Sequence, residues 1–352
     1  MLIIFALIAL VLITFTLTSR HRSHAPNYRP KIAAVGSVRR MMELTKDKRT
    51  ADGYLIDPIN DPNQTGLIGL QHSLITTEYG DLTAKLTTLN PNFAALIVQL
   101  LADTGAKPGD PVAVSLSGSF PALNLEALAA IEALELEPVI ITSAGASMWG
   151  ANDPNFTYLD LEKYLYDCGL ISHRTRYASI GGVEDIGRGL SPEGRTLLAK
   201  AIERSGVTEI KARDLDESVR LRMQFYRESA PNDKYRVFIN IGGGAAALGG
   251  VDLPSGIVEP NQQILNRGVA GEFLRLGVPV VNLSDISRLA RLNNLPIAPI
   301  PLPPAGRGKL FYEIRYSVPL AGCFTAGLLI IIFIILRLDV DYYLKKAVKK
   351  GA

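Results

Sequence analysis

Hydrophobic residues in the middle of the chain form short apolar runs that alternate with longer stretches of helical spacing. The predicted strands cover residues 112–116, 139–142, 177–180, 236–241 and 278–283. The predicted helices between and after them cover residues 121–137, 159–168, 192–206, 214–228 and 267–276. This alternation predicts an α/β fold with a mostly parallel sheet of about five strands, covered by helices.

The α/β domain is expected to span residues 20–294, and its two parts differ in pattern. Residues 30–104 form a helical lead-in, with an amphipathic helix over 30–48 and a second helix that Asn90-Pro91 opens. Residues 105–294 hold the alternating strands and helices. Residues 295–317 begin with the run LPIAPIPLPP, which is typical of a stiff proline-rich linker.

The two ends of the chain have long runs without charged side chains. Residues 1–18 and 318–336 each carry none, and each run is about as long as a bilayer span requires. We therefore expect a transmembrane anchor at 1–19, a transmembrane helix at 318–336 and a basic tail at 337–352. A cleaved signal peptide is the alternative for the first run, but no basic segment precedes it. Basic residues flank both spans about equally, and the lysine-dense tail favours an extracytoplasmic domain.

Composition narrows the classes of function that are possible. The 352 residues carry a net charge of only +3, which gives no basic face for nucleic acid. The two cysteines lie in apolar settings, so neither a disulfide nor a metal pair is predicted. No phosphate-loop or zinc-protease motif occurs, and the match of Gly242–Ala247 to the dinucleotide fingerprint lacks its helix and acidic partner. The sequence predicts no cofactor and no metal.

Every predicted strand ends in a turn of small or polar residues. In a parallel sheet these turns share one edge, where ligands bind and where glycine lets backbone N–H groups approach them. The competing explanation is that such turns favour Gly and Ser in any protein of this class. Several rich turns on one edge favour a pocket, and its predicted ligand-binding residues are Ser117, Gly118, Ser119, Ser143, Gly145, Ser147, Trp149, Gly181, Gly182, Asp185, Gly242, Gly243 and Gly244.

Candidate catalytic groups are fewer. Ser117, Ser119 or Ser147 could act as a nucleophile, with Asp185 or a histidine assisting. His72 and His173 lie in polar surroundings that are typical of surface histidines. Carboxylates such as Asp160 with Asp185, or Glu78 with Asp81, are explained equally well as solvated loop residues or as an acid–base pair. The arginine-rich helix that carries Arg213, Arg220, Arg222 and Arg227 is either a solvated surface or, if it faces a pocket, a site for an acidic ligand.

Four segments together resemble the bacterial poly-γ-glutamate system protein family. They are DPNQTGLIGLQHSLITTEYGDLTAKLTTLNPNFAA, SLSGSFPALN, GASMWGANDPNFTYLDLE and INIGGGAAALGG, within residues 30–285. The resemblance implies a membrane-anchored accessory of poly-γ-glutamate capsule or slime production in the bacterial cell membrane. Its implied partners are the polymer, the synthase and export components, and the lipid bilayer. The family has no assigned reaction, so the matching positions predict one assembled surface and no catalytic role; they are Thr76, Thr77, Gly80, Asp81, Lys85, Asn92, Ser117, Gly118, Ser119, Gly145, Ser147, Trp149, Gly150, Asn152 and Gly242–Gly244.

Three hypotheses of different classes follow from the sequence. The first is an accessory that binds the polymer or synthase components through a Gly/Ser-rich pocket. The second is a hydrolase or transferase that acts on the polymer with a serine nucleophile. The third is a nucleotide- or phosphate-binding regulator, which the missing phosphate-loop lysine weakens.

Overall fold

The computed structural model describes residues 2–230, 234–260, 267–338 and 346. It divides the chain into two compact units. One consists of Met1–Ala25 with Tyr312–Ala352, and the other is Pro26–Phe311. Most of the predicted basic tail lies outside the described residues.

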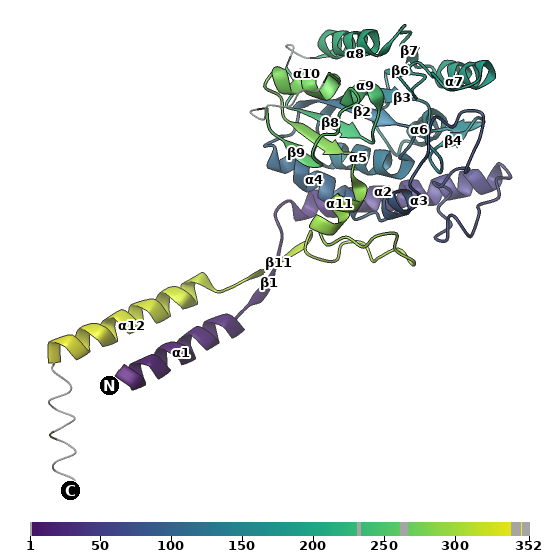
Figure 1. Ribbon diagram of the computed structural model, residues 1–352. Helices are drawn as coiled ribbons and strands as arrows, with labels where there is room; N and C mark the ends of the chain where they lie inside the picture. The colour runs from purple at the N-terminus through teal and green to yellow at the C-terminus, as the bar shows by residue number, and fades with distance from the viewer. Residues whose placement is uncertain (1, 231–233, 261–266, 339–345, 347–352) are drawn as a thin grey trace. The chain divides into compact units, whose positions relative to one another are not determined.

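A mixed sheet of seven strands forms the centre of Pro26–Phe311, in the order β7-β6-β3-β2-β8-β10-β9 (Figure 1). The strand pairs are parallel except for β9, which pairs antiparallel with β10. The strands are β2 (Pro111–Ser117), β3 (Glu137–Ser143), β6 (Tyr177–Ser179), β7 (Thr208–Glu209), β8 (Val237–Ile241), β9 (Gly256–Val258) and β10 (Val280–Leu283).

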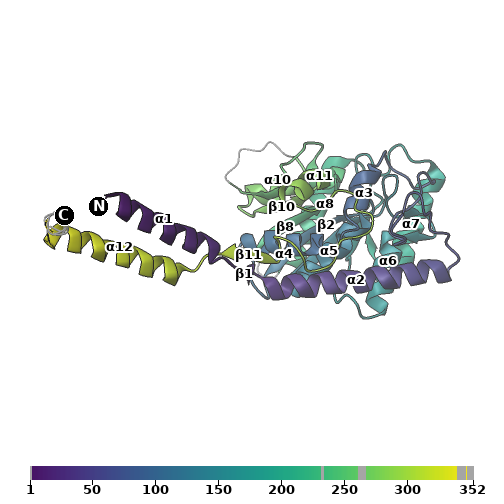
Figure 2. The same ribbon diagram turned by 90° about the horizontal axis from the view of Figure 1, so that it is seen from below.

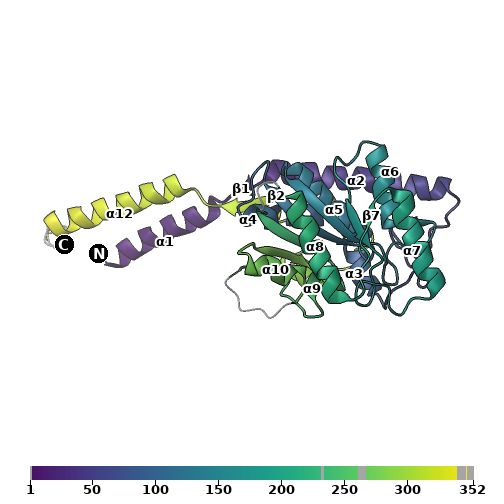
Figure 3. The same cartoon turned by 90° about the horizontal axis from the view of Figure 1, so that it is seen from above.

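The central strands are apolar on both sides because helices cover both faces of the sheet. Helices α8 (Leu215–Ser229), α9 (Ala245–Leu248) and α10 (Val269–Arg275) lie over one face (Figure 3). Phe238 of β8 packs there with Met223 and Phe273 in a buried cluster. Helices α2 (Tyr28–Ala51), α4 (Phe93–Asp103) and α5 (Pro121–Ala133) lie over the other face (Figure 2).

Local sequence signals set the ends of the other helices. Helix α7 (Pro192–Ser205) begins where the Ser191 side chain accepts a hydrogen bond from the Gly194 N–H, and it ends at Gly206 in the left-handed conformation. The remaining elements of this unit are α3 (Leu82–Thr87), α6 (Tyr158–Asp167), α11 (Ile286–Leu292) and the two-residue strands β4 (Asn152–Asp153) and β5 (Phe156–Thr157).

The strand order reverses next to β2. After β2 the chain moves outward through β3, β6 and β7, then returns to place β8 on the other side of β2. The carboxyl ends of β2 and β8 therefore flank the switch point, which is the usual place for a ligand crevice in a doubly wound sheet. Ser117 ends β2, and Gly242 directly follows β8.

The α/β class and the five predicted strands are found, but the predicted count of about five strands is too low. Strands β7 and β9 add one strand to each edge, and β9 makes the sheet mixed. These two strands have only two and three residues, so they carry no alternation long enough to recognise.

The proline-rich run lies against the body of this unit. The Pro299 carbonyl accepts a hydrogen bond from Asn63, and the Ala298 N–H donates to the Thr87 hydroxyl. Leu310 and Phe311 are buried. In place of a free spacer, residues 295–311 form an irregular strap that hydrogen-bonds to the helical lead-in.

The smaller unit contains α1 (Leu2–Thr18), β1 (His21–His24), β11 (Tyr312–Arg315) and α12 (Val318–Leu338). Strands β1 and β11 pair antiparallel, with His21 opposite Arg315. The rings of Phe15 and Phe324 meet edge to face, so α1 and α12 contact each other along their sides.

The predicted membrane spans at 1–19 and 318–336 are wrong, and with them the two-span localisation. Among the residues that the structure describes, none of the helices combines the length and the apolar character that crossing a bilayer requires. The 17 residues of α1 extend about 26 Å, against a hydrocarbon core of about 30 Å. Both uncharged runs do form helices, but the absence of charge alone does not make a membrane span.

Candidate functional site

The turns that the sequence singled out lie side by side at the carboxyl edge of the sheet. The Gly118 N–H donates to the Ser143 carbonyl at 2.9 Å, and the Gly145 N–H donates to the Ile180 carbonyl at 2.8 Å. The Gly242 N–H donates to the Leu283 carbonyl at 3.2 Å. The predicted residues after β2, β3, β6 and β8 therefore belong to one continuous edge.

Gly242 lies directly against the turn after β2. It has a φ of +79°, and a β-carbon placed on it would lie 3.2 Å from the Phe120 ring and 3.6 Å from the Ser117 β-carbon. A larger residue would be strained by the backbone conformation and would crowd the Phe120 ring. The packing of the sheet edge thus explains the glycine at the first position of the run after β8. The next residue, Gly243, is exposed and lines an open pocket of about 650 Å³ together with Ser284 and Asp285.

The segment before α3 lies alongside the turn after β3. The Thr77 N–H donates to the Ala146 carbonyl at 2.9 Å, and the Met148 N–H donates to the Glu78 carbonyl at 3.0 Å. On its other side the same turn contacts the turn after β2, where the Ser147 N–H donates to Ser119 Oγ at 3.0 Å. Segments that are far apart in the sequence, and that carry the family resemblance, are thereby assembled in one place.

Lys85 of α3 occupies the centre of this assembly. Its Nζ donates to the Ser119 carbonyl and lies 2.8 Å from Ser147 Oγ, with the Phe120 ring centroid at 3.9 Å. Its side chain is 2 % exposed. Desolvation lowers the pKa of Lys85 to about 7, although the negative charges of Glu78 and Asp81 act in the opposite direction.

Asp185 belongs to a separate buried network under the ends of β3 and β6. Its carboxylate pairs with Arg222 of α8 at 2.8 Å, and both side chains are 1 % exposed. Hydroxyl groups complete the network. Ser143, Ser179 and Ser218 each donate to Asp185, and Arg222 also donates to Ser143 and Ser179. Both oxygens of the Asp185 carboxylate have partners, so the residue links α8 to the sheet. Its predicted role in catalysis stays a prediction.

The predicted ligand-binding turns are for the most part packed against one another. The side chains of Ser117, Ser119, Ser143 and Ser147 are all buried, and Trp149 is half-buried with a φ of 65°. Gly181 and Gly182 form the tight turn in which the Asp185 N–H donates to the Gly182 carbonyl. Of the glycines after β8, Gly243 is exposed and Gly244 is half-buried. Binding by this set of residues stays a prediction.

The other titratable candidates have structural partners or lie on the surface. Asp160 forms a capping box at the start of α6 and pairs with Arg204, and Asp81 caps α3. His72 is exposed, and His173 lies 3.7 Å from the Glu137 carboxylate. Within the described residues, no three His, Cys, Asp or Glu side chains are grouped as metal ligands would be.

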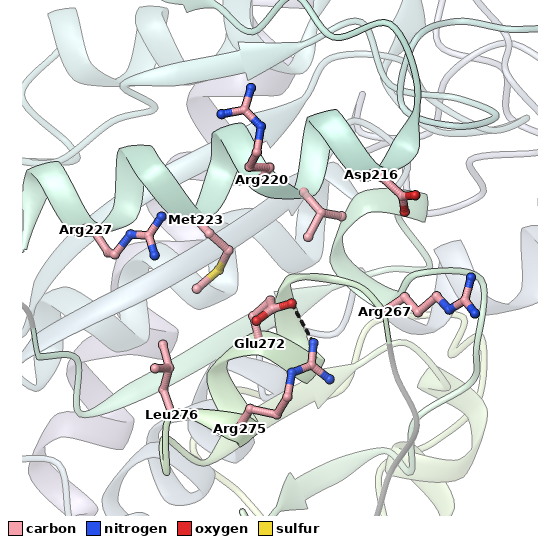
Figure 4. A pocket seen from close by; sticks show the side chains of 9 residues that line it. Asp216, Arg220, Met223, Arg227, Arg267, Glu272, Arg275 and Leu276 are labelled. Atoms are coloured by element: carbon pink, nitrogen blue, oxygen red, sulfur yellow. Dashed lines mark hydrogen bonds and ion pairs between the residues drawn. The ribbon is translucent and has the colours of Figure 1, made fainter.

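A basic pocket of about 530 Å³ lies between α8 and α10 (Figure 4). We call it the arginine groove; it is lined by Asp216, Val219, Arg220, Met223, Arg227, Arg267, Glu272, Arg275 and Leu276. Figure 4 shows the α8 side chains on one side and those of Arg267 and α10 on the other. Four guanidinium groups and two carboxylates give the groove a formal charge of +2.

Among the residues that the structure describes, two arginines of the groove have no carboxylate partner. Arg275 pairs with Glu272 at 2.6 Å, and Arg220 lies 3.5 Å from Glu217. No carboxylate in the described parts of the chain pairs with Arg227 or Arg267, and both side chains are exposed. The arginines on and just before α8 therefore have three different settings. Arg222 is buried with Asp185, and Arg213 pairs with Glu217. Arg220 and Arg227 face the groove.

Comparison of the chain with family models, with curated proteins and with solved structures found no match in any of the three.

Proposed function

We propose that this protein is an accessory of poly-γ-glutamate biosynthesis or export that binds the polymer in the arginine groove. The observation that carries the proposal is a single groove lined by four arginines, two of which have no carboxylate partner among the described residues. We take poly-γ-glutamate as the polymer because four segments of the chain resemble the poly-γ-glutamate system family.

The chemistry of the groove suits this ligand. Each residue of poly-γ-glutamate exposes one α-carboxylate, and guanidinium groups bind carboxylates through paired N–H donors. In the γ-linked backbone, two methylene groups lie between each α-carbon and the amide carbonyl of the same residue. Val219, Met223 and Leu276 give the groove apolar surface against which such methylenes can pack.

The groove supports this function better than the Gly/Ser turns do. Ser117, Ser119, Ser143 and Ser147 are between 4 % and 7 % exposed. Their hydroxyl groups already have partners inside the protein, which are backbone N–H groups, the Asp185–Arg222 pair and Lys85. A polyanion needs exposed cationic groups, and in the arginine groove these include Arg227 on α8 and Arg267 just before α10. In polymer binding, the turns then hold the sheet edge and α8 in place.

A binding titration with the full chain tests the proposal. Fluorescein-labelled poly-γ-glutamate is titrated with the protein at about 50 mM and about 300 mM salt, and fluorescence anisotropy is recorded. We expect saturable binding that weakens at the higher salt, because partly exposed ion pairs are screened. Unlabelled poly-γ-glutamate should compete, and neutral dextran should not. Absence of binding at the lower salt, or equal competition by dextran, would contradict the proposal.

A further inference from the structure

We propose that Ser147 and Lys85 form a serine–lysine pair for acyl transfer, with Ser147 as the nucleophile and Lys85 as its general base. The inference goes beyond polymer binding. It depends on the proposed function only for the expected substrate, which is an amide bond of the bound polymer.

The geometry of the pair is that of a nucleophile and its base. Lys85 Nζ lies 2.8 Å from Ser147 Oγ, within the range for direct proton transfer. Ser147 follows β3 in the turn Gly145–Gly150, at the carboxyl edge of the sheet. Its backbone N–H is fixed by Ser119 Oγ at 3.0 Å. The Ser119 carbonyl and the Phe120 ring hold the amine in position from the other side.

The surroundings of Lys85 favour the unprotonated amine that a base requires. No carboxylate of the described residues forms an ion pair with Lys85. Glu78 and Asp81, from the segment before α3, are the charged groups that act on it, while Ser119, Phe120 and Ser147 are uncharged. A neutral amine can donate to the Ser119 carbonyl and still accept the Ser147 hydroxyl proton with its lone pair.

The reaction balances without an oxidant or cofactor. Ser147 Oγ attacks the amide carbonyl carbon as its proton passes to Lys85 Nζ. The carbon–nitrogen bond then breaks, and the same proton moves to the leaving amine. Water or another amine attacks the resulting serine ester, with Lys85 again as the base, and restores the Ser147 hydroxyl.

Access to Ser147 requires a local opening, because the residue is only 4 % exposed. The adjoining segment Thr77–Gly80 is hydrogen-bonded beside the turn, and its Tyr79 is 88 % exposed. We place the opening at this segment, so reaction with a probe should be slow compared with that of an open serine-hydrolase site.

Labelling with a fluorophosphonate tests the pair directly. The full chain is incubated with the probe for several hours between pH 6 and pH 9, and the modified residue is identified by mass spectrometry of peptides. We expect modification of Ser147 that becomes at least about tenfold faster as the pH rises through 7. Lys85→Arg, which keeps a positive charge that does not titrate, should remove the pH dependence and most of the labelling. Ser287→Ala, on α11, is the control and should label like the unchanged chain.

The unchanged chain alone can overturn the inference, so the test does not depend on a variant that folds. Absence of label on Ser147 across the pH range, a rate that does not change with pH, or modification of Ser119 in its place would each overturn it. Polymer binding is measured separately in the anisotropy titration. Labelled Ser147 without polymer binding would leave the serine–lysine pair standing and contradict the proposed function.

Discussion

Several charged side chains are buried in the larger unit, among them Lys85, Asp185 and Arg222. The sequence predicts a site at only some of these positions. Asp185 was predicted as a site residue, but its partner Arg222 was placed on a possible solvated surface. The sequence does carry a pattern that indicates burial of Arg222. Ser218, Arg222 and Tyr226 recur every four residues, next to the apolar Val219 and Met223, and so lie on the inner face of the helix. Lys85 was marked only by the family resemblance, because one lysine in a short polar helix has no pattern that predicts burial.

The lowered pKa of Lys85 makes a prediction about stability. The unfolded chain binds this proton up to a pKa near 10.5, whereas the folded protein releases it at about 7. Between these values the unfolded state binds more protons, so stability rises with pH. Relative to Lys85→Met, the free energy of unfolding should rise by about 2 kcal/mol from pH 7 to pH 9. Urea unfolding of both proteins at the two pH values measures this difference. Parallel behaviour of the two proteins would show that Lys85 keeps an ordinary pKa.

The buried Asp185–Arg222 pair predicts a large effect of removing one partner. Asp185→Ala leaves the Arg222 charge buried without its carboxylate, which should lower the free energy of unfolding by about 3–5 kcal/mol. Asp185→Ala combined with Arg222→Met removes both charges and should recover part of this loss. Chemical denaturation of the three proteins measures the two differences. A stable Asp185→Ala variant would mean that the pair does not hold α8 on the sheet.

At the scale of elements, the regular alternation predicted every central strand and the helices that connect them. The two edge strands were missed because they are short, and the pairing of β1 with β11 was missed because it joins segments almost 300 positions apart. The contact of residues 76–80 with the turn after β3 also joins segments that are far apart in the sequence, so it could not be predicted either. The residue types of both loops were noted, but only the fold brings them together, through backbone hydrogen bonds that any residue could make.

The loop that contains Gly69 also contacts the turn after β3, since the Gly69 N–H donates to the Trp149 carbonyl. This contact predicts opposite effects for two glycine substitutions. A β-carbon on Gly69 would lie 1.8 Å from the Gly150 carbonyl oxygen, whereas one on Gly36, in the exposed part of α2, meets nothing within 4 Å. Gly69→Ala should therefore lower the free energy of unfolding by about 1–3 kcal/mol. Gly36→Ala should raise it by about 0.5–1 kcal/mol, since alanine favours the helix. Thermal and urea unfolding compare the two, and equal effects would show that the loops do not touch at Gly69.

For the molecule as a whole, the arrangement of charge supports a role in holding an acidic polymer. The net charge of +3 does not predict such a site, because 34 Asp and Glu residues nearly balance the 37 Lys and Arg residues, of which only four line the arginine groove. The arginines of α8 were visible in the sequence as a cluster. Their alignment with Arg267 and Arg275 could not be predicted, since it depends on how α8 and α10 pack on the same face of the sheet.

The most direct test of polymer binding in the groove is the affinity of a charge-reversed protein for poly-γ-glutamate. Arg227→Glu with Arg267→Glu changes the groove from +2 to −2. Arg307→Glu with Lys200→Glu makes the same change in net charge at exposed positions outside it. We predict that the groove variant binds at least about 30-fold more weakly than the unchanged chain at about 50 mM salt, or about 2 kcal/mol. The control variant should stay within about threefold. Equal losses in the two variants, or none in the groove variant, would contradict the account.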